Sequence, residues 1–283
     1  MPENPYAAPR SRVDDPQPPM VFDGDLIPEG RGVPAGKGWR WIADAWAFTG
    51  QQRGTFIGVF LLYIVVLIVL GIVPFIGFLT STLLTPVING GLQLGFDTVR
   101  RGGQLEVGCL FSAFRNHAGK LIGVGAITLG ITILIGIIVF AILGVSFAGI
   151  LASGQQPTPE DIQGMLLPGA LAVLVGIAVA LPLYMFLWFA PPLIVLGGLD
   201  VGAALKASFL GCLKNIVPFL VWSFAVLGLW LAVLIPSGLI WLSLGIGAAI
   251  ATYFLLAIAF AVLLGPVLVA SVYLSYRDIF HDV

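Results

Sequence analysis

Residues Thr55 to Phe96 read TFIGVFLLYIVVLIVLGIVPFIGFLTSTLLTPVINGGLQLGF, a run of 42 residues without a charged side chain. A helix needs about 20 apolar residues to cross the roughly 30 Å hydrocarbon core of a bilayer. The run therefore has room for two spanning helices, and Gly71, Pro74 and Gly77 mark a tight turn between them. This pattern predicts a helical hairpin in a membrane.

The composition extends this prediction to most of the chain. Of its 283 residues, 59% are hydrophobic and only 10% are charged, whereas soluble domains carry about 25% charged residues. We predict an all-α, polytopic membrane protein whose membrane domain is 37–283. Its six transmembrane helices are expected at 55–74, 76–97, 120–150, 167–196, 216–235 and 241–273. Residues 1–36 hold eight of the nineteen prolines together with scattered Asp residues, which predicts a disordered Pro/Asp-rich cytoplasmic tail.

The positions of the basic residues predict the orientation. With six spans, all 13 Lys and Arg residues fall before the first span, between the second and third, between the fourth and fifth, or after the sixth. No basic residue is left for the opposite connections. Because Lys and Arg collect in cytoplasmic loops, we expect both the N-terminus and the C-terminus in the cytoplasm of a bacterial inner (plasma) membrane protein.

Short amphipathic segments precede the first, third and fifth spans. Their apolar residues recur at helical spacing, which predicts cytoplasmic helices lying in the membrane interface. The segments are Trp39, Ile42, Ala43 and Trp46; Val107, Leu110, Phe111 and Phe114; and Val201, Leu205, Phe209 and Cys212. An interfacial helix followed by a hairpin, used three times, is one interpretation; unrelated inner connections that share aromatic and basic residues are the other.

A polar stripe marks the second predicted span. Asn89, Gln93 and Asp97 are spaced by four and therefore share one helix face, which Arg100 continues at the cytoplasmic end. Polar residues within a span face protein or a water-filled cavity. The stripe is therefore either the wall of a polar cavity or a set of hydrogen bonds between helices, with Asp97 paired to a nearby Arg.

No pattern of catalytic or metal-binding residues occurs in the sequence. Cys109 and Cys212 stand alone, and His117 and His281 lie outside the predicted spans. We therefore expect no catalytic residues, no metal, no cofactor and no nucleic-acid partner. A lipid-modifying enzyme would need polar groups at headgroup depth, for which the sequence offers only Asp97, Glu106, Arg115 and His117.

Four strings carry a family resemblance. They are Gly36–Ile42 (GKGWRWI), Leu187–Val195 (LWFAPPLIV), Ala204–Asn215 (ALKASFLGCLKN) and Ser271–Phe280 (SVYLSYRDIF). Together they resemble a family of proteobacterial predicted integral inner-membrane proteins, over roughly residues 36–281. The resemblance implies a multi-helix inner-membrane protein and supplies no activity.

The adjacent Arg277 and Asp278 follow the sixth predicted span. We interpret these residues and Arg100 as structural charges that lock the end of that span to an inner connection, through a partner such as Asp200 or Arg100.

The sequence thus favours an integral membrane protein that acts without catalysis, as an interaction or lipid-associated protein. Its expected partners are membrane lipids, with a protein partner or a homo-oligomer left open. The alternative is a small-solute transporter or permease that uses the stripe of Asn89, Gln93 and Asp97.

Overall fold

The computed structural model describes residues 24–152, 158 and 163–282. Within them the chain is helical, and the only strand-like pairing is an isolated bridge between Leu26 and His281. The elements are α1 (Lys37–Gly50), α2 (Arg53–Gly71), α3 (Ile76–Arg100), the 3-10 turn η1 (Val107–Phe111), α4 (Ala113–Asn116), α5 (Ala118–Ala152), α7 (Leu166–Leu187), α8 (Ala190–Val195), α9 (Val201–Lys214), α10 (Ile216–Leu244) and α11 (Ile246–Phe280). The all-α prediction is confirmed for this part of the chain.

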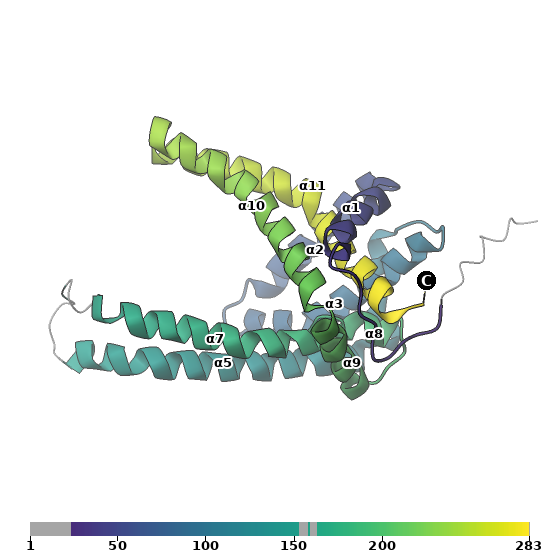
Figure 1. Ribbon diagram of the computed structural model, residues 1–283, viewed down its shortest axis with the longest axis horizontal. Helices are drawn as coiled ribbons and strands as arrows, with labels where there is room; N and C mark the ends of the chain where they lie inside the picture. Colours follow the sequence, from purple (N-terminus) through teal and green to yellow (C-terminus); the bar gives the residue numbers. More distant parts are fainter. Residues whose placement is uncertain (1–23, 153–157, 159–162, 283) are drawn as a thin grey trace, which may run out of the picture.

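Three helical hairpins follow one another along the chain, namely α2/α3, α5/α7 and α10/α11. Each is preceded by shorter helical elements: α1, then η1 with α4, then α9. Figure 1 shows α5/α7 and α10/α11 as two long pairs that diverge from a common end. We call this common end the hub; it consists of α1, the second half of α3, η1, α4, α8, α9 and the last turns of α11.

The buried core lies in the hub and not along the hairpins. Two clusters of buried apolar residues draw on α1, α3, α8, α9 and α11, with Trp41 and Tyr273 among the largest buried side chains. The most apolar 18-residue windows of the long helices are only 0–28% buried. The hairpins therefore expose apolar faces that suit a lipid environment.

Among the described residues, five helices are long and apolar enough to cross a membrane: Arg53–Gly71, Ala118–Gly144, Leu166–Val195, Ile216–Leu244 and Ile246–Phe280. The second predicted span is a helix, α3, but it is not one of these five. The reason is its composition, because polar residues such as Thr85, Asn89 and Gln93 interrupt its apolar sequence. α3 also contacts α2, α5, α8 and η1 and buries much of its second half. A helix enclosed by protein can carry polar residues that a lipid-facing helix cannot.

The turn between the first two predicted spans lies where the sequence predicts it, whereas the turn between the last two does not. The predicted turn between the first two spans is confirmed, since α2 ends at Gly71 and α3 begins at Ile76. The last two spans were predicted to separate at 236–240, and this is wrong, because α10 runs through Pro236 to Leu244. The chain reverses instead at Gly245, where φ is +85° and ψ is 177°. This backbone conformation is essentially restricted to glycine.

The elements before the hairpins also differ in detail from their prediction. The buried face of α1 contains Trp41, Ile42, Ala45 and Phe48, whereas Trp39 and Trp46 of the predicted face are exposed. The single helix predicted around 107–114 is divided at Ser112 into η1 and α4. These helices form, but the structure does not show that they lie in a membrane interface.

The part of the predicted tail that the structure describes, 24–36, is packed against the hub. The N–H groups of Ile27 and Arg31 donate to the carbonyls of Phe280 and Ile279, both at 2.8 Å. The Asn215 side chain accepts from the N–H of Val33 at 2.8 Å. Residues 24–36 are therefore packed against the hub although the prediction places them in the disordered tail, whereas residues 1–23 of the tail lie outside the described part.

A buried serine bridges a break in the fourth predicted span. Residues 167–196 form two helices, α7 and α8, which are separated just before Pro191 and Pro192. Ser208 of α9 accepts a hydrogen bond from the N–H of Phe189 at 2.9 Å and donates one to the carbonyl of Met185 at 2.7 Å. Its hydroxyl thus replaces the helical hydrogen bond that these two groups would otherwise make with each other.

Ser208→Ala is expected to lower the free energy of unfolding by about 1–3 kcal/mol, because it leaves the buried N–H of Phe189 without its acceptor. Ser237→Ala is the matched control, since the Ser237 hydroxyl bonds a carbonyl of its own helix, that of Val233. Thermal unfolding of both variants in the same detergent measures the difference. Equal melting of the two variants would show that the break does not need Ser208.

Candidate functional site

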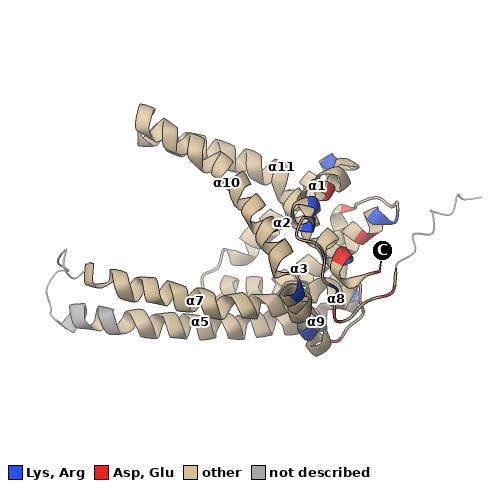
Figure 2. Ribbon diagram, in the orientation of Figure 1, with Lys and Arg blue, Asp and Glu red and all other residues tan. Residues whose placement is uncertain are grey.

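The charged residues of the described chain gather in the hub. Figure 2 shows Lys and Arg around α1, α9 and the inner ends of α3 and α11, and none along the outer parts of α5, α7, α10 and α11 that the structure describes. Two polar networks organise this end. One joins α3 to α11, and the other joins α1 and residues 24–33 to α11.

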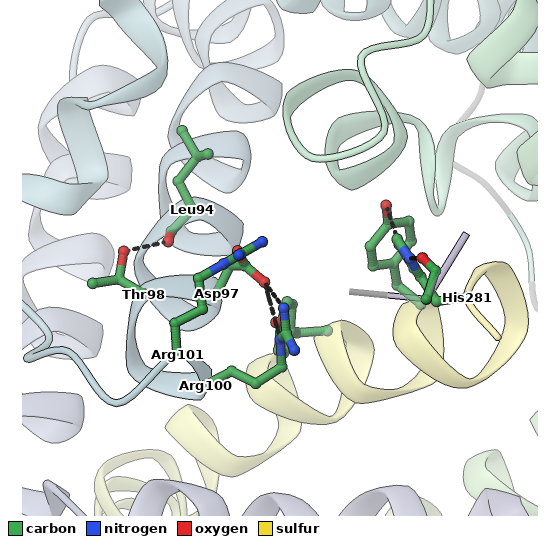
Figure 3. Close-up of polar contacts among 9 residues, drawn as sticks. Leu94, Asp97, Thr98, Arg100, Arg101 and His281 are labelled. Carbon is green, nitrogen blue, oxygen red and sulfur yellow. Dashed lines mark hydrogen bonds and ion pairs between the residues drawn. The ribbon is translucent and has the colours of Figure 1, made fainter. Parts of the chain in front are cut away.

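The first network centres on Asp97, which is 8% exposed. Because Arg100 and Arg101 follow by three and four positions, both lie on the Asp97 side of α3. Arg100 Nη2 is 3.0 Å from Oδ1, and Arg101 Nε is 2.7 Å from Oδ2. The Tyr273 hydroxyl of α11 donates to Oδ1 at 2.8 Å and accepts from Arg100 Nε at 2.9 Å. Figure 3 shows the two arginines converging on Asp97.

The rest of the stripe is less well satisfied than Asp97. Asn89 is partly buried, and Gln93 is 5% exposed. The Oε1 atom of Gln93 is buried without a hydrogen-bond partner in the described structure. A pocket of about 500 Å³ borders the same helix, but its lining from α3 is Leu94, Gly95 and Thr98 and includes no member of the stripe. The contacts of Asp97 therefore fit the structural interpretation of the stripe, in which Asp97 pairs with a nearby Arg. The role of Gln93 stays a prediction.

The second network holds the end of α11 against α1. Asp278 Oδ2 is 3.0 Å from Lys37 Nζ and accepts a hydrogen bond from Trp41 Nε1 at 2.8 Å. The Asp278 carbonyl accepts from Arg31 Nε at 2.7 Å. Arg277, the neighbour of Asp278, is 9% exposed.

The partners of these charges differ from the ones the sequence suggested. Asp200, offered as a partner for the Arg277–Asp278 pair, binds Lys120 of α5 at 2.6 Å. Asp278 pairs with Lys37, a residue far earlier in the chain. Whether these contacts act as a lock on the end of α11 stays a prediction.

Sequence reasoning missed Tyr273 and Asn215. Asn215 is fully buried and binds both residues 24–36 and α9, with its amide donating to the carbonyls of Arg31 and Gly211 at 2.8 Å each. Both residues belong to strings that carry the family resemblance. The available signal was therefore a polar residue inside an otherwise apolar family string.

Burial shifts the pKa values of both cysteines and of His281 in the hub. Burial raises the pKa of the Cys109 thiol to about 11 and that of Cys212 to about 12. Since the thiolate is the reactive form, both cysteines are protonated at neutral pH and react slowly. Burial lowers the pKa of His281, whose ring nitrogens are 3.2 Å from the Gly24 carbonyl and 3.0 Å from the Tyr276 hydroxyl. This histidine is therefore neutral and structural at pH 7.

Comparison with known proteins supports the family resemblance. The chain is 26% identical over 259 residues to a probable inner membrane protein of Burkholderia thailandensis. The alignment covers 88% of this chain and 92% of that protein. The chain is thus similar to a probable inner membrane protein, and its described residues include five helices of membrane-spanning length and apolarity. No protein-family model and no solved structure matches the chain.

The four family strings meet in one place in the structure. One buried cluster contains Trp41 of the first string, Phe189 of the second, Cys212 of the third and Phe280 of the fourth. The segments that resemble the family are thus the segments that build the hub, and not the lipid-exposed hairpins.

The contact between Tyr273 and Asp97 yields a direct test. Tyr273→Phe keeps the ring that stacks on Phe48 but removes a hydrogen bond to a buried carboxylate, at an expected cost of about 1.5–3 kcal/mol in the free energy of unfolding. Tyr184→Phe, at a ring that is 52% exposed on α7, is the control. Thermal unfolding in detergent should separate the two variants, and a Tyr273→Phe protein as heat-resistant as the control would contradict the role of this network.

Proposed function

We propose that this protein is a non-enzymatic, lipid-associated protein of the inner membrane, with its hub at the cytoplasmic surface. In this arrangement α2, α3, α5, α7, α10 and α11 make six crossings. Two observations support it. The described Lys and Arg residues collect in the hub, as the positive-inside rule requires of a cytoplasmic face. The hairpin α2/α3 also places the inner end of α3, with Arg100, in the hub beside α11.

The exposed tryptophans of α1 support an interfacial position for the hub. Trp39 and Trp46 are 55% and 42% exposed. The Arg53 guanidinium lies over the Trp46 ring, 4.1 Å from its centroid. Tryptophan and arginine side chains of this kind are typical of the boundary between headgroups and acyl chains.

The observation that carries the lipid proposal is an apolar groove between α7 and α10. It has a volume of about 370 Å³ and is lined by residues of both helices, among them Tyr184, Met185, Trp188, Phe219 and Trp222. Trp188 packs edge-on against both Phe219 and Trp222. Because both helices are long and apolar enough to cross a membrane, the groove would face the acyl chains of the surrounding lipids.

The groove lies where α7 and α10 leave the hub, since Cys212 of α9 also lines it. Aromatic rings and a flexible methionine form a surface that can adapt to a bent hydrocarbon chain. We infer that a phospholipid acyl chain of the inner leaflet occupies the groove and fills the angle between the two diverging hairpins.

Photo-crosslinking tests this proposal. The protein in nanodiscs that contain a phospholipid with a diazirine in its acyl chain should label most strongly in the groove, at Leu181 and Leu220. Ser223→Trp should fill the groove and reduce that labelling, whereas Phe224→Trp, at a neighbouring residue that is 68% exposed and outside the groove lining, should not. Labelling is mapped by mass spectrometry. Labelling that follows side-chain exposure alone would overturn the proposal.

A second candidate function, a small-solute permease, rests on the buried Oε1 atom of Gln93. An unpartnered amide oxygen inside a helix bundle is costly and therefore suits a site that a polar solute or water occupies. Asn89 and Asp97 share its face of α3, which would extend such a path to the hub.

Aqueous labelling distinguishes the two functions. In a Cys109→Ala/Cys212→Ala background, we expect Gln93→Cys to stay unreactive towards a membrane-impermeant maleimide, because Gln93 is buried by protein. Thr98→Cys, at an exposed position one turn closer to the hub end of α3, is the reactive control. Rapid labelling at position 93 would reveal a water-filled path and favour the permease.

A further inference from the structure

The pocket that borders α3 near Leu94 lies within the hub, on the side of α3 opposite the Asp97 network. It has a volume of about 500 Å³ and lies between the last turns of α3 and residues 104–115. Its polar lining comprises Thr98, Gln104, Glu106, Cys109, Ser112 and Arg115. In Figure 3, Thr98 lies on the side of α3 away from α11, whereas Asp97 faces α11.

Close packing fixes the walls of this pocket. A Cβ atom at Gly91 would lie 2.4 Å from the Cys109 carbonyl oxygen, and one at Gly95 would lie 2.9 Å from the Cys109 sulfur. These glycines let η1 lie directly on α3, so that residues 106–115 are held beside the helix. Leu110, fully buried, anchors the same segment.

The pocket presents one negative and one positive side chain. Glu106 and Arg115 are both exposed, and the ion pairs found in the described residues use neither of them. The remaining ionisable group in the lining, Cys109, is protonated at neutral pH because burial raises its pKa to about 11. The pocket is therefore electrically balanced, with two separate opposite charges.

Apolar side chains flank these charges. Val107, Phe111 and Phe114 are 51%, 48% and 38% exposed. The ring centroids of the two phenylalanines are 6.3 Å apart. Phe111 also lines the pocket. A site with polar walls and an adjoining exposed apolar edge fits an amphipathic ligand at the surface of a membrane.

We propose that this pocket binds a zwitterionic headgroup that consists of an ammonium and a phosphate. Glu106 would bind the ammonium and Arg115 would bind the phosphate. The hydroxyls of Thr98 and Ser112 donate to the carbonyls of Leu94 and Cys109, so their oxygens would accept from the ammonium. This inference rests on the proposed lipid association, for which the α7–α10 groove is a separate line of support. The same chemistry occurs in an ethanolamine phospholipid and in its free glycerophosphoethanolamine headgroup.

The native thiol of Cys109 reports on this pocket. In a Cys212→Ala protein, Cys109 is the single cysteine, and a bound headgroup should slow its alkylation by N-ethylmaleimide. We expect the rate to fall by at least about fivefold, roughly 1 kcal/mol of protection, when phosphatidylethanolamine is added to phosphatidylglycerol nanodiscs. Glu106→Gln and Arg115→Gln should each abolish the protection, whereas Arg40→Gln, at an exposed basic residue of α1, should retain it.

The remaining outcomes decide the source of the ligand and the fate of the proposal. Protection in detergent by glycerophosphoethanolamine alone would identify a free solute as the ligand, and protection only in nanodiscs would identify the phospholipid. Equal alkylation rates with and without phosphatidylethanolamine, or protection that survives both charge-removing variants, would overturn the headgroup site. Acyl-chain crosslinking in the α7–α10 groove, measured on the same preparations, would show separately whether the lipid association itself holds.

Discussion

A bilayer cannot satisfy buried polar groups, and this constraint explains where the protein places its core. The charges of the described chain and most of its largest buried aromatic residues, such as Trp41 and Tyr273, lie together in the hub. The hairpins that leave the hub need only satisfy their backbones, which helices do internally. Hence α5 and α10 are almost uniformly apolar on all sides.

α3 is the exception that connects the two regions. It is shielded by neighbouring helices, which allows it to carry Gln93 and Asp97 in a membrane-length hairpin. Asp97 shows how a carboxylate is tolerated there, because two guanidinium groups and the Tyr273 hydroxyl surround it. A buried charge with this many partners fixes how α3 and α11 meet more than it adds to stability.

Periodicity and composition predict the elements of this fold well, because helices in lipid depend on local apolar length. The turn at 72–75 and helices α1 and α9 follow from such local signals. The site depends on distant contacts, which no local pattern contains. Lys37 and Asp278 are 241 positions apart, and Ser208 repairs a helix break 19 positions before it. The spacing of the polar stripe places its members on one face of α3, but the pairing of Asp97 with Tyr273 is visible only in the structure.

The hydrogen bonds between residues 27–31 and residues 279–280 have a consequence for biosynthesis. The ribosome makes 27–31 before any hairpin and 279–280 after the third, so these partners cannot meet until all three hairpins have been translated. The hub must therefore close last, and until then its polar side chains lack their final partners.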